Sequence, residues 1–121
     1  MPIELVQQQD DVVVFRATNT ITPTDMNQAQ EHLAVTIKQI GSVRGMIQLE
    51  DFSGWEKSEE WSDMSFFNKH DKGIKAIAVV GDPRWKADML TFLLAGMRQA
   101  EVEFFSDEAK ARSWLDERAS A

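Results

Sequence analysis

Cysteine is absent from the 121 residues, and this one absence excludes several kinds of site. Without a thiol the chain has no disulfide, no thiolate nucleophile and no cysteine-ligated zinc or iron–sulfur centre. Long apolar runs are absent as well, because the longest, around residues 89–97, is about half of what a bilayer-spanning helix needs. The N-terminal residues contain neither a basic segment nor an apolar one. We therefore expect no secretory signal, no transmembrane segment and a cytoplasmic protein.

Positive charge is scarce, with 13 lysines and arginines against 20 aspartates and glutamates, a net charge of −7. An acidic chain repels phosphate backbones, so we expect no nucleic-acid partner. The hydrophobic fraction of 43% and the charged fraction of 27% are ordinary for a globular protein. The length fits one domain, and we take residues 1–121 as that domain.

The first forty residues predict a β-hairpin followed by a helix. Ile3, Leu5 and the apolar run 12–15 flank a polar turn at residues 7–11, a pattern typical of two paired strands. Thr22 is placed as an N-cap, with proline next and an acid three residues after the cap. An apolar stripe at spacings of three and four then continues to Gly41, where the helix should end. Its members are Met26, Ala29, Leu33, Ile37 and Ile40.

The rest of the chain alternates between predicted strands and helices. Strands are expected at 43–52, 74–80 and 101–105, and helices at 58–72, from Asp82-Pro83 toward Gly96, and at 106–118. The order β-β-α-β-α-β-α-β-α indicates an α/β domain with a mixed five-stranded sheet and four helices. Polar residues recur on one face of three strands, so we expect most helices on the other face. They are Arg16, Gln48, Glu50, Glu101 and Glu103.

This chain resembles the SpoIIAA-like proteins, also described as STAS/SEC14-like. The resemblance depends on the run Ile74 to Trp85, which contains Ala-Val-Val-Gly-Asp-Pro-Arg-Trp, and on Lys69-His70 before it. It is supported by Thr22 to Asp25 and by residues 108–115, and it covers essentially the whole chain. It implies the α/β fold shared by STAS domains and lipid-carrier CRAL-TRIO domains. Kinship of fold does not by itself transfer a site.

STAS domains that antagonise anti-sigma factors are phosphorylated on a serine after the third strand, in an Asp-Ser-Ser/Thr-Gly-like motif. Ser58 occupies that place here, with Ser53 nearby, although their neighbours do not form the motif. A phospho-regulated interaction domain of this kind is therefore the alternative interpretation of the chain.

Catalytic and metal-binding patterns are weak. Acids crowd residues 50–63, and with His70 they would suit a hard cation, but they also fit the start of a helix, where carboxylates are favourable. His70 has no nucleophile motif beside it, and the chain has no glycine-rich phosphate loop. We therefore expect no enzyme, no cofactor and no metal site.

Apolar residues exceed what one-sided packing requires in the predicted second and third helices. The surplus either is core or lines a pocket, a homodimer face or a partner site. The leading interpretation is a non-enzymatic binding or regulatory module that engages an apolar small molecule or a protein partner through these helices. The candidate binding residues are Trp61, Met64, Phe66, Phe67, His70, Trp85, Met89, Phe92 and Leu93.

Overall fold

A mixed five-stranded sheet in the order β1-β2-β3-β4-β5 forms the centre of the protein. The computed structural model describes residues 3–59, 71–93, 95–98 and 100–118. β1 pairs with β2 antiparallel, and the next three pairings are parallel. The strands are β1 (Ile3–Gln9), β2 (Val12–Ile21), β3 (Val43–Trp55), β4 (Ile74–Val80) and β5 (Glu101–Phe105). The mixed five-stranded α/β sheet is confirmed.

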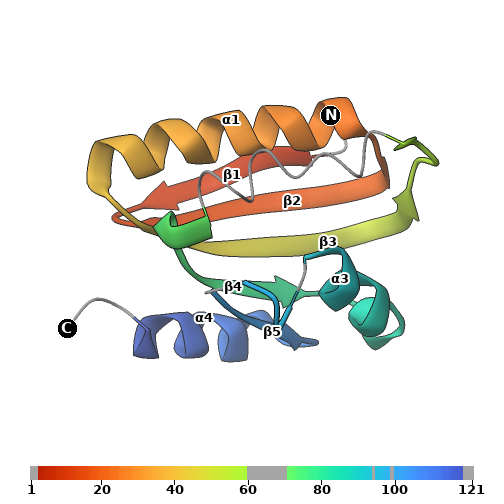
Figure 1. Cartoon of the computed structure of the whole chain (residues 1–121). Helices are drawn as coiled ribbons and strands as arrows, with labels where there is room; N and C mark the ends of the chain where they lie inside the picture. Colours follow the sequence, from red (N-terminus) through yellow and green to blue (C-terminus); the bar gives the residue numbers. More distant parts are fainter. Residues whose placement is uncertain (1–2, 60–70, 94, 99, 119–121) are drawn as a thin grey trace.

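Three α-helices lie within the described residues, and they cover both faces of the sheet (Figure 1). They are α1 (Pro23–Ile40), α3 (Lys86–Phe92) and α4 (Glu108–Glu117), with short 3-10 turns at Asp71–Gly73 and Pro83–Trp85. The helix predicted over 58–72 falls largely on residues 60–70, outside the described residues; its last predicted residues form a 3-10 turn. The described structure thus supports three of the four predicted helices.

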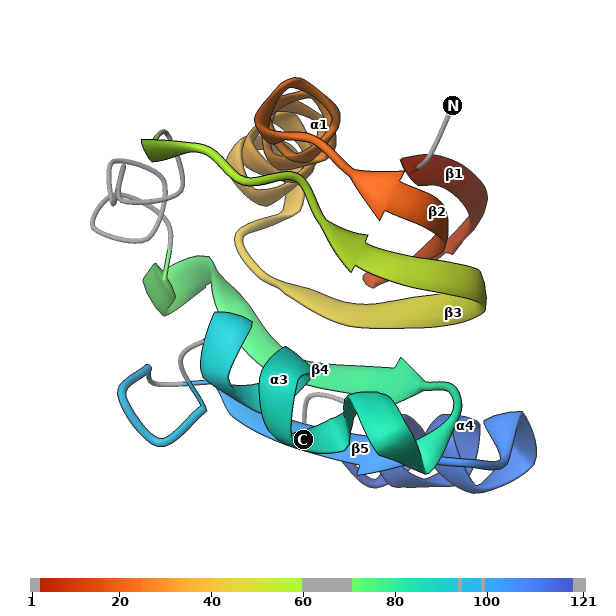
Figure 2. The ribbon, with the colours of Figure 1, turned by 90° about the vertical axis from the view of Figure 1, so that its right-hand side faces the viewer.

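The two faces of the sheet have separate cores. One contains Val13, Phe15 and Val79, and both α1 and α3 pack on it. The other contains Val14, Met46 and the two alanines of β4, and it receives Ala111 and Leu115 of α4. Figure 2 shows α3 and α4 on opposite sides of β4 and β5. The expectation that helices lie mostly on one face is therefore only partly right, since α4 occupies the other.

Helix α1 begins and ends where the sequence predicts. The Asp25 N–H donates to Thr22 Oγ1 at 3.2 Å, and the Thr22 N–H donates to Asp25 Oδ2 at 3.2 Å, which makes a complete capping box. Gly41 ends the helix at a φ of 95°, in the left-handed region that glycine adopts without strain. Leu33 and Ile37 are half-buried against the core, whereas Ile40 is 51% exposed and does not belong to the buried stripe.

The face that carries α4 is polar where α4 does not cover it, as the strand pattern predicts. Arg16 of β2 lies between two acids, Glu4 at 3.2 Å and Glu50 at 2.9 Å. Gln48 of β3 donates to Glu108 of α4 at 2.7 Å, and Arg112 pairs with the same carboxylate at 2.9 Å. These contacts are largely exposed, so they contribute little to stability.

Candidate functional site

Four aromatic rings meet where β3 ends and α3 begins. Phe52 lies with its ring centroid 5.1 Å from that of Trp55 and 4.8 Å from that of Trp85, both edge-on. The Trp55 centroid is 6.0 Å from that of Trp85 and 5.0 Å from that of Phe92. Each ring therefore touches at least one other in a favourable edge-to-face or tilted arrangement. We call these residues, Phe52, Trp55, Trp85 and Phe92, the aromatic cluster.

Irregular backbone at the ends of two parallel strands brings the cluster together. The β2–β3 register shifts on either side of Asn19, and both Asn19 and Asp51 have a positive φ, 52° and 51°. Such bulges bend a strand and redirect the side chains that follow. Asparagine and aspartate tolerate this conformation better than other residues that have a side chain. The register shifts and the positive φ of Asn19 and Asp51 therefore redirect the end of β3, which carries Phe52 and Trp55.

The Trp85 indole lies over Gly54 of β3. Gly54 has a φ of 110°, and a Cβ there would lie 3.6 Å from the Trp85 ring, so the indole packs directly over the glycine. On the other side, Asp82 caps the 3-10 turn through a 2.9 Å bond from the Arg84 N–H, and Pro83 opens that turn. The turn fixes Trp85 just before α3. The Arg84 guanidinium lies 5.3 Å from the centre of the Trp85 ring, within cation–π distance.

The aromatic cluster is only partly covered, and one of its polar atoms lacks a partner within the described part of the chain. Phe52 is buried, whereas Trp55, Trp85 and Phe92 are half-buried. The indole N–H of Trp55 is inaccessible to solvent and has no hydrogen-bond acceptor among the residues that the structure describes. Buried tryptophan N–H groups usually find an acceptor, and an unpaired one costs about 1–3 kcal/mol.

The predicted binding residues divide into three groups. Trp85 and Phe92 belong to the aromatic cluster. Met89 and Leu93 are core residues, 1% and 7% exposed, so their assignment to a binding surface is not supported. Trp61, Met64, Phe66, Phe67 and His70 lie outside the described residues.

Sequence reasoning missed Phe52 and Trp55 as members of the site. The signal was present, because consecutive parallel strands place the end of β3 beside the turn that follows β4. Helix α3 is also shorter than predicted: it ends at Phe92 rather than near Gly96, and Leu93 leaves helical geometry to join the core.

The two serines of the alternative interpretation lie in different surroundings. Ser53 is exposed and belongs to β3, so it is a strand residue and does not start a helix. Ser58 follows β3 in an irregular segment and is half-buried. Phosphorylation of either serine stays a prediction.

Within the part of the chain that the structure describes, no three histidine, aspartate or glutamate side chains gather as metal ligands would. Glu60, Asp63 and His70 of the predicted acidic segment lie outside that part. None of the helices described is long and apolar enough to cross a bilayer.

One partly buried ion pair ties the sheet to α4. Arg44 of β3, 7% exposed, donates to both carboxylate oxygens of Asp11, at 2.9 Å and 2.6 Å, and its remaining nitrogen donates to the Leu115 carbonyl at 2.7 Å. Hydrogen bonds from the guanidinium hold the pKa of Asp11 below its ordinary value, against the opposing effect of burial. The same pairing raises the pKa of Arg44. This pair serves the fold rather than the aromatic cluster.

The comparison with protein families gives a match to the SpoIIAA-like model over residues 12–116. The chain belongs to the SpoIIAA-like family. A crystal structure of an uncharacterized DUF3478-family protein with a SpoIIAA-like fold, from Shewanella loihica PV-4, is similar, with a TM-score of 0.67 and 24% identity. The match covers 93% of this chain and 91% of that one. No curated protein matches this chain. At that identity the likeness establishes the fold alone, and a likeness to CRAL-TRIO domains stays a prediction.

Proposed function

We propose that this SpoIIAA-like chain is a non-enzymatic binding module that holds an apolar small molecule against the aromatic cluster. The observation that carries the proposal is the meeting of four aromatic rings, three of them half-buried, at one end of the sheet. Binding pockets are lined mainly by such side chains, with a few placed polar groups. The carboxyl ends of parallel strands are also where open α/β sheets most often bind ligands.

The Trp55 N–H suggests the polar part of the ligand. Because this donor is buried without an acceptor among the described residues, a bound molecule whose carbonyl or similar oxygen reached it would remove the cost of leaving it unpaired. An apolar body packed on Trp85 and Phe92, with one acceptor that reaches the Trp55 N–H once the rings around it shift apart, is the ligand that this chemistry favours. A protein partner on the same surface, a homodimer and the cytoplasmic location stay predictions.

A titration with Nile red, a neutral apolar dye with a carbonyl oxygen, tests the proposal. We expect saturable fluorescence enhancement at one site, and at least about tenfold weaker binding for Trp85→Ala, since a buried aromatic contributes roughly 2–3 kcal/mol. Trp114→Ala is the matched control, because Trp114 is another half-buried tryptophan but lies on α4 at the opposite face. Equal loss in both variants, or enhancement that never saturates, would contradict the proposal. Native mass spectrometry of the purified chain would then show whether a ligand is retained.

A further inference from the structure

The last strand, β5, has one free edge in the described structure, where it pairs with β4 alone. The Gly81 N–H donates to the Phe105 carbonyl at 3.0 Å, so the backbone groups of Phe105 point toward β4. Backbone groups alternate in direction along a strand. The N–H and C=O groups of Val102 and Phe104 therefore point away from the sheet, and they form the free edge that a further strand would use.

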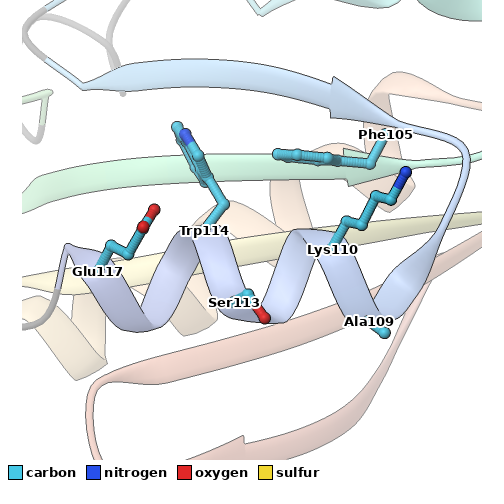
Figure 3. A pocket seen from close by; sticks show the side chains of 6 residues that line it. All are labelled: Phe105, Ala109, Lys110, Ser113, Trp114 and Glu117. Atoms are coloured by element: carbon cyan, nitrogen blue, oxygen red, sulfur yellow. The ribbon is translucent and has the colours of Figure 1, made fainter.

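A shallow, open groove lies on the α4 side of β5, between Phe105 of this strand and α4 (Figure 3). Its volume is about 400 Å³, and its two aromatic side chains are Phe105 of β5 and Trp114 of α4, whose ring centroids are 5.7 Å apart. Both rings are half-buried. The Arg118 guanidinium lies 4.0 Å from the centre of the Trp114 ring and holds that indole in place. Lys110 and Glu117 also line the groove.

The charge of the edge indicates what would fit. Glu103 shares the α4 side of β5 with Phe105, is exposed, and has no ion-pair partner among the described residues. Its neighbour on that side, Glu101, pairs with Arg118. A second copy of β5 that paired antiparallel, Val102 opposite Phe104, would set the two copies of Glu103 against each other. Like charges directly opposite are destabilising, so the edge disfavours a second copy and favours a basic side chain.

We propose that the β5 edge and its groove bind an extended basic segment of another protein by strand addition. The segment's backbone pairs with Val102 and Phe104, a lysine or arginine lies opposite Glu103, and an apolar side chain two positions away contacts Phe105 and Trp114. This site is independent of the aromatic cluster, since α3 packs on the other face of the sheet.

A labelled peptide, acetyl-Thr-Val-Lys-Val-Leu-Thr-amide, tests the proposal by fluorescence anisotropy with the full chain. Its lysine and leucine lie on one side of an extended strand, as the site requires. We expect saturable binding that weakens as salt rises, because the lysine contact is an exposed charge pair. N-methylation of alternate residues removes the backbone donors along one edge of the peptide strand, so two sets of peptides test its two edges separately. The set that lacks the donors facing β5 should lose affinity about tenfold or more, because it cannot form the ladder.

Charge reversal supplies the specificity test. Glu103→Lys should weaken binding of the lysine peptide about three- to fivefold. The same variant should bind a peptide with glutamate in place of that lysine better than the wild type does. Glu31→Lys, at an exposed position on α1, makes the same change in net charge away from β5 and should leave both peptides unaffected. Trp114→Ala should weaken the binding of both peptides. Absence of saturable binding, equal binding of all N-methylated peptides, or equal effects of Glu103→Lys and Glu31→Lys would overturn the proposal. A dimer detected by sedimentation, together with protection of the Val102 and Phe104 amides in hydrogen exchange, would overturn it in favour of a second copy.

Discussion

The Trp85 ring stands nearly edge-on to the Phe52 ring, with the planes at 71° and the centroids 4.8 Å apart. The two residues are far apart in sequence, on either side of β4, and parallel pairing of β3 with β4 brings them together. Their contact fastens the turn before α3 to the end of β3. It therefore serves the fold and the proposed site at once.

Replacement of Trp85 by alanine should lower the free energy of unfolding by about 2–3 kcal/mol, somewhat below the range for fully buried tryptophans because the ring is half-buried. Chemical denaturation monitored by circular dichroism would measure this. Trp85→Phe retains an aromatic ring over Gly54 and should cost much less. A loss below about 0.5 kcal/mol for the alanine variant would mean that the ring contacts do not stabilise the turn.

The capping box of α1 predicts a smaller and more local effect. Thr22→Ala removes the acceptor of the Asp25 N–H and should cost about 1 kcal/mol. Thr24→Ala, at an exposed position one residue into the first turn, should change stability by less than about 0.5 kcal/mol. Equal midpoints for the two variants in thermal unfolding would show that the box contributes nothing.

The Asp11–Arg44 pair predicts a defined pH dependence. Because the pKa of Asp11 is lower in the folded protein than in the unfolded chain, its contribution to stability is fully present above the unfolded value and is lost as pH falls through the folded one. Asp11→Asn should cost about 2–3 kcal/mol near neutral pH, since it leaves the Arg44 charge without its partner.

The same variant should lose less stability on acidification than the wild type, over the range below about pH 4. Urea unfolding at a series of pH values would compare the two proteins. If their stabilities stay parallel down to the acid limit, Asp11 is not responsible for this part of the pH dependence.

Gly81 marks a close approach between β4 and β3. A Cβ at this position would lie 2.8 Å from Leu49 Cβ, a backbone-proximal atom that cannot rotate away. Gly81→Ala should therefore destabilise the fold by about 1–3 kcal/mol. Gly45→Ala is the control, because a Cβ there meets nothing within 4 Å and alanine suits a strand better than glycine. Denaturation of the two variants under the same conditions checks the difference.

Sequence reasoning predicted most accurately the elements whose signals are local. The limits of α1 follow from the Thr22 cap and from Gly41, and the limits of β4 from an apolar run that ends at a turn. The placement of α4 was missed although the sequence contains a hint. Small and large residues alternate along β4, and the small ones, Ala76 and Ala78, make room for α4 on their face.

Elements that depend on pairing were harder to predict. β3 continues to Trp55, past Ser53 and Gly54, because its last residues pair with β2 as far as Ile21. Local propensity does not mark that extension, since glycine is a poor strand former and a single tryptophan after it makes no strand pattern. The aromatic cluster was missed for the same reason: Trp85 and Phe92 were candidates from their own helix, whereas Phe52 and Trp55 join them only through the sheet.

The most direct test of the proposed function follows the indole N–H signals of the four tryptophans in a nitrogen–proton correlation spectrum. Camphor, an apolar ketone with a single acceptor, would be added to the full chain. The proposal predicts a saturable shift of the Trp55 indole signal, a smaller shift for Trp85, and an unchanged Trp114 signal. A Trp55 signal that does not move, or shifts of all the indoles in proportion to added camphor, would contradict it.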